Sequence, residues 1–169
     1  MKLLETIQFE DFTPEEIAKL ELREAARAVL FDNDDKIALL HVSKNKYHKL
    51  PGGGIEKDED ITTALKRECL EETGCQILIK EELGLIVEYR KRLNLKQESY
   101  CYIAEVEGIK GTPTFEKGEI EEGFQLIWVN LDEAINLLTK ESPDDYEGRF
   151  IVKRDNLYLK TAKELLTSK

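Results

Sequence analysis

Alternation between hydrophobic and polar residues predicts most of the strands in this chain. Residues 98–107 alternate most regularly, while residues 37–42 and 124–129 are shorter, largely apolar runs next to turn-forming residues. A further apolar segment over residues 76–92 predicts one or two strands, broken near Gly84. Together these segments predict a sheet of several strands.

Residues 21–31 favour a helix by composition and a strand by pattern. Ala26 and Ala28 would lie on one side of a strand and Arg27 on the other. We predict a strand, joined as a hairpin to the run at 37–42 through an acidic turn. The first 20 residues alternate weakly, which predicts an N-terminal arm containing a short strand.

Two long segments predict helices. Residues 60–73 lack glycine and proline, begin next to acidic residues, and end at Gly74, a typical helix stop. A helix start at residue 131 is followed by a break at Ser142-Pro143 and a C-terminal helix over residues 146–166. Strands that alternate with long helices predict the α/β class, with a mixed sheet in a sandwich.

The densest chemical pattern lies around the first long helix. Glycines at 52–54 follow Pro51, so the backbone there is able to approach a ligand closely. At about 100° per residue, Glu68, Glu71 and Glu72 fall within an arc of about 100° at the rim of the apolar side. Three carboxylates so close together repel one another, and a hard divalent cation, Mg²⁺ or Mn²⁺, would neutralise them.

The whole run over residues 53–75 resembles the Nudix box, Gly-x5-Glu-x7-Arg-Glu-U-x-Glu-Glu-x-Gly-U, where U is a bulky aliphatic residue. All seven glycine and polar positions match, and a pair between Arg67 and Glu59 would tie the loop to the helix as structural support. Cys69 and Cys75 occupy the two U positions. Because cysteine is a small apolar residue that is often buried, this departure affects packing more than chemistry.

The resemblance implies a Nudix-type α/β/α sandwich over nearly the whole chain and a hydrolase similar to MutT or ADP-ribose pyrophosphatase. The metal ligands that it implies are the Gly52 carbonyl oxygen and the carboxylates of Glu68, Glu71 and Glu72. A glutamate in the loop before the last strand often serves as general base or extra ligand in such proteins. The candidates for that role are Glu116, Glu119, Glu121 and Glu122. By spacing to Trp128 we favour Glu122, with Glu119 second, so the predicted catalytic residues are Glu68, Glu72 and Glu122.

Three residues are candidates for substrate binding. Arg27 lies on the strand at 21–31, and Lys46 and His48 lie in a basic segment just before the glycines. His48 stands where the resembling family often has an aromatic residue, so it would stack on a base, with an exposed histidine of no role as the alternative. The basic run at 90–92 could reach a substrate phosphate, but we prefer to interpret it as a solvated strand end.

Composition narrows the class of protein. With 169 residues, 41% of them hydrophobic, the chain is long enough for one domain with a sizeable core. A net charge of −10 argues against nonspecific binding to nucleic acid or membrane surfaces. Three cysteines do not suggest a disulfide framework, and there is no signal pattern or membrane-length apolar run, so we expect a cytoplasmic protein. We expect one Nudix hydrolase domain over 1–169, with an arm at 1–20, the box at 53–75 and a helical part at 131–169.

The expected function is Mg²⁺-dependent cleavage of a P–O–P bond in a nucleoside diphosphate linked to another group. ADP-ribose, nucleotide sugars and dinucleoside polyphosphates are such substrates. Two alternatives stay open: a pyrophosphatase that removes damaged nucleoside triphosphates, and a nucleotide-sensing module without hydrolysis. The expected partner is a small nucleotide and neither a nucleic acid polymer nor a membrane, and a homodimer formed through the N-terminal arm is a further hypothesis.

Overall fold

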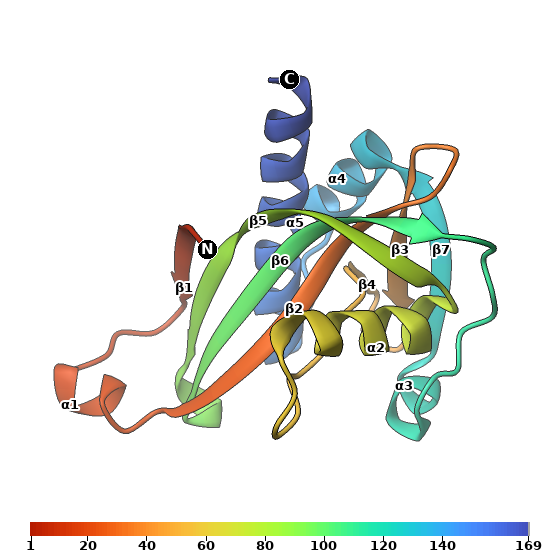
Figure 1. Ribbon diagram of the computed structural model, residues 1–169. Helices are drawn as coiled ribbons and strands as arrows, with labels where there is room; N and C mark the ends of the chain where they lie inside the picture. The colour runs from red at the N-terminus through yellow and green to blue at the C-terminus, as the bar shows by residue number, and fades with distance from the viewer. Residues whose placement is uncertain (169) are drawn as a thin grey trace.

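A mixed sheet of seven strands with helices on both faces forms the body of the computed structural model, which describes residues 1–168 (Figure 1). The strands are β1 (Leu3–Gln8), β2 (Glu21–Phe31), β3 (Lys36–Val42), β4 (Tyr47–Lys49), β5 (Gln76–Arg90), β6 (Leu95–Glu107) and β7 (Phe124–Asn130). The helices are α1 (Pro14–Ile17), α2 (Ile61–Thr73), α3 (Lys117–Glu122), α4 (Leu131–Lys140) and α5 (Tyr146–Thr167), with a 3-10 turn, η1 (Lys91–Leu93). The sheet order is β1-β5-β6-β2-β3-β4, and β7 also pairs with β3. Parallel pairs β1/β5 and β2/β6 make the sheet mixed, which confirms the predicted fold class.

Helix α2 forms where the glutamate-rich run predicted it. The Asp60 side chain caps its first turn by accepting a hydrogen bond from the Thr63 N–H, 2.7 Å away. Gly74 ends the helix in the left-handed conformation, at φ 71°, which favours glycine. The apolar side of the helix, including Leu65 and Cys69, packs against the even-numbered residues of β2 in one hydrophobic core.

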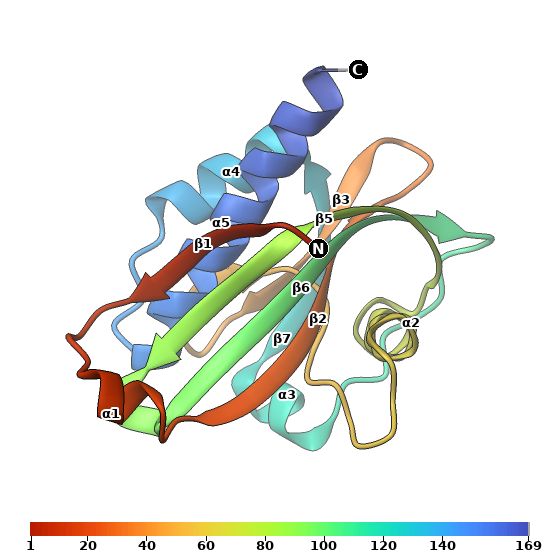
Figure 2. The same ribbon diagram turned by 60° about the vertical axis from the view of Figure 1, so that its left-hand side comes forward.

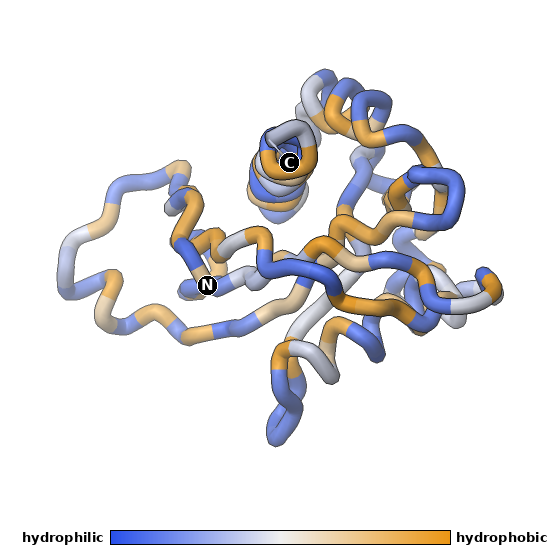
Figure 3. Tube along the Cα trace, turned by 45° about the horizontal axis from the view of Figure 1, so that its top comes forward, coloured by the Kyte–Doolittle hydropathy of each residue, from blue (hydrophilic) through white to orange (hydrophobic). Residues whose placement is uncertain are grey.

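A second core lies on the opposite face of the sheet, under α4 and α5. Figure 2 shows α2 on one side of the strands and α4 and α5 on the other. Phe150 and Tyr158 of α5 pack there against odd-numbered residues of β2, such as Val29. In Figure 3 the turns of α5 carry both hydrophobic and hydrophilic residues, as expected for a helix with one face against a sheet.

Strands β2 and β3 diverge directly after their turn. They pair only at Phe31 and Ile37, because beyond the turn the edge of β2 opposite β6 pairs with the glycine loop, and the edge of β3 opposite β7 pairs with β4. The predicted hairpin is therefore confirmed only at its turn. Beyond that point the glycine loop runs beside β2: the Ala26 N–H donates to the Gly53 carbonyl at 2.9 Å, and the Ala28 N–H to the Pro51 carbonyl at 3.1 Å.

Three other details differ from the sequence predictions or extend them. Strand β5 continues through Gly84 with irregular register instead of breaking there. Helix α3 forms inside the segment expected to be a turn-rich loop. The arm strand β1 pairs with β5 of the same chain. Among the helices formed by residues 1–168, none is long and apolar enough to cross a bilayer.

Candidate active site

A cavity of about 430 Å³ lies beside the glycine loop, between elements from both faces of the sheet. One side, which we call the carboxylate wall, comes from α2 and α3 and consists of Glu68, Glu71, Glu72, Glu116 and Glu119. The other side, which we call the arginine cluster, comes from β2, β5 and α5 and consists of Arg23, Arg27, Arg90 and Arg154. The structure therefore brings acidic and basic groups together in one cavity, where Lys49 and Arg67 pair with the wall and Glu147 pairs with the cluster.

Glu72 is the most deeply buried member of the carboxylate wall, with 1% of its surface exposed. Its Oε1 accepts from the Lys49 ammonium at 2.9 Å, and its Oε2 accepts from the Gly52 N–H at 2.6 Å. Gly52 has φ 128°, and a Cβ there would lie 2.1 Å from the Ala26 carbonyl oxygen. Only glycine fits this close approach of loop to strand, which holds the loop against Glu72.

Arg67 connects the wall to the start of the box. Its guanidinium donates to both carboxylate oxygens of Glu59 at 3.0 Å, so the predicted pair is present. The same group donates to Glu68 Oε1 at 2.8 Å, Glu71 Oε2 at 3.2 Å and the Gly54 carbonyl at 3.1 Å. The hydrogen bonds from Arg67 lower the pKa of Glu59, and Glu59 in turn raises the pKa of Arg67.

The carboxylate wall has the donor set that a hard divalent cation requires. Five carboxylates face only two cationic side chains, Lys49 and Arg67, which leaves negative charge in excess. Within residues 1–168 no three His, Cys, Asp or Glu side chains are arranged so that they could hold a metal ion as they stand. Glu72 is paired with Lys49, and Glu68 and Glu71 are paired with Arg67. A metal ion would take over contacts that Arg67 and Lys49 make now. Carboxylate oxygens suit Mg²⁺ and Mn²⁺, so the residues fit the predicted ion.

Helix α3 decides which of the loop glutamates reaches the cavity. Glu119 lines it, whereas Glu122 is exposed at the end of the helix and lies outside the lining. Burial raises the pKa of Glu119 to about 7. The hydrogen bond from the Glu116 N–H lowers this pKa, and the negative charge of Glu72 raises it further. The order of preference drawn from spacing therefore reverses, and Glu119 replaces Glu122 as the candidate base.

The arginine cluster is held by two buried carboxylates. Glu88 Oε2 accepts from Arg90 Nη2 at 2.9 Å and from Gln97 Nε2 at 2.8 Å, and lies 3.6 Å from Arg154 Nη1. Asp155 accepts from Arg154 Nε at 2.7 Å and from the Leu50 N–H at 2.8 Å, which fixes α5 to the start of the glycine loop.

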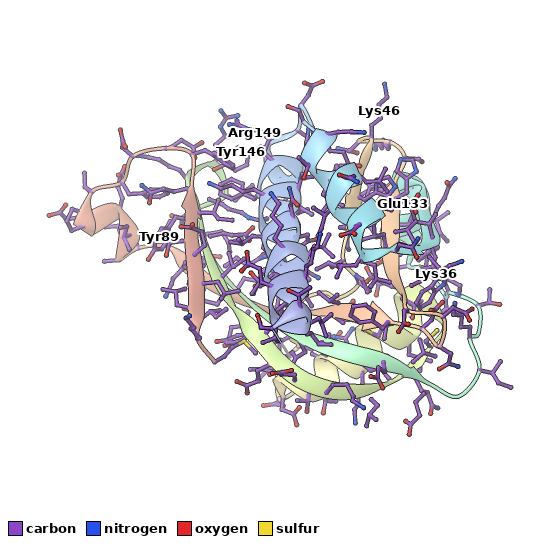
Figure 4. All side chains as sticks on the ribbon, turned by 90° about the horizontal axis from the view of Figure 1, so that it is seen from above. Lys36, Lys46, Tyr89, Glu133, Tyr146 and Arg149 are labelled. Carbon is purple, nitrogen blue, oxygen red and sulfur yellow. The ribbon has the colours of Figure 1, made fainter. Side chains whose placement is uncertain are left out.

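Of the three predicted substrate contacts, the structure brings only Arg27 to the cavity. Lys46 is exposed at the tip of the turn between β3 and β4 and points outward (Figure 4). The His48 ring lies 2.5 Å from Glu141 through Nδ1 and stacks on His41, with ring centroids 4.6 Å apart. The neighbouring Lys49 lines the cavity instead.

Sequence reasoning missed most of the arginine cluster. The interpretation of residues 90–92 as a solvated strand end was wrong for Arg90, which is only 2% exposed. Arg154 stands four residues from Phe150 and from Tyr158, in the middle of the buried stripe of α5. A charged residue in register with an apolar stripe was the signal available in the sequence.

A mixed sheet between helices, with a glycine loop and a glutamate-rich helix at one cavity, defines an α/β/α protein built around a Nudix box. A sequence profile of the NUDIX domain matches residues 21–148, and the chain belongs to this family. Nudix hydrolase 4 of Arabidopsis thaliana is 32% identical over 99 residues, or 59% of this chain and 45% of that protein. Diphosphoinositol polyphosphate phosphohydrolase 2 of Rattus norvegicus is 27% identical over 126 residues, or 72% of this chain and 65% of that protein.

These matches span about half to two thirds of the relatives' own lengths. Among solved structures, a NUDIX hydrolase from Nitrosomonas europaea superposes with a TM-score of 0.64 at 18% identity, covering 85% of this chain and 90% of that one. At this identity the likeness establishes the fold alone.

Proposed function

We propose that this chain is a divalent-metal-dependent hydrolase that cleaves a P–O–P bridge in a small phosphorylated substrate. The observation that carries the proposal is the single cavity in which the carboxylate wall of a Nudix box faces the arginine cluster. Such a cavity can hold a metal ion at its carboxylates and offers guanidinium donors to a phosphorylated substrate. Charge stabilisation and positioning are what phosphoryl transfer needs from a protein.

The residues at the cavity have different roles in this reaction. Glu68, Glu71 and Glu72, with the Gly52 carbonyl, would hold the metal. A divalent cation in such a site polarises phosphoryl oxygens and lowers the pKa of water. Glu119 accepts the proton as water attacks one phosphorus; the new P–O bond forms, the bridging P–O bond breaks, and the released phosphate takes the bridging oxygen.

For the substrate, the starting candidate is the class predicted from the sequence, a nucleoside diphosphate linked to another group. The guanidinium donors that line the cavity support the diphosphate part of this class. The lining contains no aromatic side chain among the described residues, so a nucleobase would find no aromatic ring to stack on in the cavity. The name of the Rattus norvegicus relative adds phosphorylated inositols to the compounds worth testing.

The test is phosphate release from a panel of compounds, measured with Mg²⁺ and with a chelator. The panel holds ADP-ribose, nucleotide sugars, dinucleoside polyphosphates, NADH, coenzyme A, nucleoside triphosphates with their oxidised forms, and phosphorylated inositols. We expect metal-dependent cleavage of at least one member at a P–O–P bond, and loss of that activity in Glu72→Gln. Tight binding of a member without cleavage of any would overturn hydrolysis in favour of a sensing role.

A further inference from the structure

The arginine cluster holds more hydrogen-bond donors than the protein itself satisfies. Arg27, Arg90 and Arg154 are each at most 5% exposed and line the cavity. Among the described residues, five of their buried nitrogens have no acceptor: Nε and Nη1 of Arg27, Nε of Arg90, and both Nη atoms of Arg154. Buried donors without acceptors are costly, so native proteins rarely keep them without a ligand or ordered water.

The charge of the cluster is also out of balance. The four guanidiniums of the cluster face three carboxylates, because Glu147 pairs with Arg90 and adds to Glu88 and Asp155, and Arg27 forms no ion pair within residues 1–168. Burial, and next the charge of Arg154, lower the pKa of Arg27 to about 10. One positive charge and several donors therefore remain for an anion with several oxygens, a description that fits a phosphate group better than a neutral ligand.

The cluster and the carboxylate wall are separate parts of the cavity. Arg27 lies on the face of β2 that packs under α5, whereas the metal-type glutamates lie on α2, which covers the opposite face. The glycine loop stands between them. A diphosphate at the carboxylate wall would leave the arginine cluster available for another group.

We propose that the arginine cluster is a second anion subsite, which binds a phosphate group of the substrate outside the cleaved bridge. The substrate is then a phosphoanhydride that carries at least one additional phosphate, with no nucleobase held in the cavity. That the bound compound is a substrate rests on the proposed function, whereas the binding of phosphate by the cluster does not depend on it. The network through Glu88 and Asp155 holds the subsite in place, so these two act as positioning residues.

The decisive experiment measures binding without hydrolysis, in buffer stripped of metal by a chelating resin, because EDTA is itself a polyanion. Tripolyphosphate, pyrophosphate, orthophosphate and adenosine are titrated by calorimetry. We expect affinity to fall in that order and adenosine not to bind. Arg27→Met should weaken tripolyphosphate binding about tenfold to a hundredfold, as expected for the loss of charged hydrogen bonds.

Arg92→Met is the matched control, because it removes the same charge from a side chain that is 68% exposed and outside the cavity. It should bind tripolyphosphate as the wild type does. Arg27→Met binding as tightly as the wild type, or adenosine binding as tightly as tripolyphosphate, would overturn the subsite.

Stability distinguishes a binding role from a structural one. Because Arg27 has no ion-pair partner among the described residues, Arg27→Met should unfold at the same denaturant concentration as the wild type or a higher one, while it loses tripolyphosphate binding. A large loss of stability with binding retained would assign Arg27 to the fold. If the methionine variant does not fold, Arg27→Lys serves the same comparison, since it keeps the charge and loses the fork of donors, with an intermediate loss of binding expected.

A second readout separates this inference from the proposed function. Glu72→Gln should lose metal-dependent hydrolysis and still bind tripolyphosphate in metal-free buffer. In the wild type with Mg²⁺, coenzyme A should be cleaved with higher kcat/KM than dephospho-coenzyme A, and NADPH with higher kcat/KM than NADH. Arg27→Met should remove the difference within each pair; equal rates for both pairs in the wild type would count against the subsite even if hydrolysis is confirmed.

Discussion

The carboxylate wall and the arginine cluster are supplied by the chain in different ways. Three of the five glutamates in the wall come from one helix, α2, at spacings that the sequence displays directly. The four arginines come from β2, β5 and α5, which are far apart in the chain and meet only when β2 pairs with β6 and α5 packs on the sheet. A local sequence motif can therefore predict the type of reaction, whereas the groups that select the substrate come together only through tertiary packing.

The largest effect should come from the wall. Glu72→Gln keeps the volume and removes a charge, so we expect kcat to fall about a thousandfold or more, a typical loss when a charged group central to the reaction is removed. The measurement is phosphate release at saturating Mg²⁺, with circular dichroism to check folding. Because Lys49 would lose its partner, the double variant Lys49→Met/Glu72→Gln is the control for stability. Full activity in Glu72→Gln would remove Glu72 from the metal site.

The second-largest effect on kcat should distinguish between two glutamates of α3. Glu119→Gln should lower kcat about a hundredfold, the usual contribution of a general base, because Glu119 lines the cavity. Glu122→Gln is the matched control and should change kcat by no more than about twofold, as for other exposed positions. Equal, mild losses in both variants would mean that neither residue is the base.

The pH profile tests the same assignment. A raised pKa means that Glu119 keeps its proton to higher pH, and the protonated form is unable to accept another. The rate should therefore fall as pH is lowered through about 7, or through a somewhat lower value where a bound cation opposes the shift. This acid limb should be missing in Glu119→Gln. If the variant retains it, another group titrates.

The same difference between the carboxylate wall and the arginine cluster explains which parts of the site can be predicted from the sequence. The spacing from Gly53 to Gly74 predicted helix α2, its cap and the pair of Arg67 with Glu59, all of which are local. The choice of Glu122 rested on spacing to Trp128 and did not anticipate α3, whose N-terminal end, with Glu116 and Glu119, lines the cavity while Glu122 lies at its exposed C-terminal end. The burial of Arg90 also depends on α5, whose Glu147 pairs with Arg90 and whose Arg154 lies beside Glu88, and these tertiary contacts are not visible in the alternation of β5.

A fourth prediction concerns what holds the arginine cluster together. Glu88→Gln should lower the free energy of unfolding by about 3 kcal/mol or more, because it leaves buried guanidiniums without their shared carboxylate. Glu147→Gln is the control: Glu147 also pairs with Arg90, but its side chain is 57% exposed, so its loss should cost no more than about 1 kcal/mol. Urea denaturation measures both. Equal losses would show that the cluster does not depend on Glu88.

The smallest effect should come from a basic residue that the sequence placed near the substrate. Lys46 has φ 58° at the tip of a turn, a conformation that asparagine tolerates better than lysine, so Lys46→Asn should raise the free energy of unfolding by less than about 1 kcal/mol. Its kcat/KM should stay within about twofold of the wild type, as expected for an exposed position. Lys49→Met, only three residues further along and inside the cavity, should lower kcat/KM far more, because Lys49 contacts Glu72. A large loss of kcat/KM in Lys46→Asn would mean that the turn closes over the cavity when substrate binds. Substrate recognition would then extend beyond the carboxylate wall and the arginine cluster.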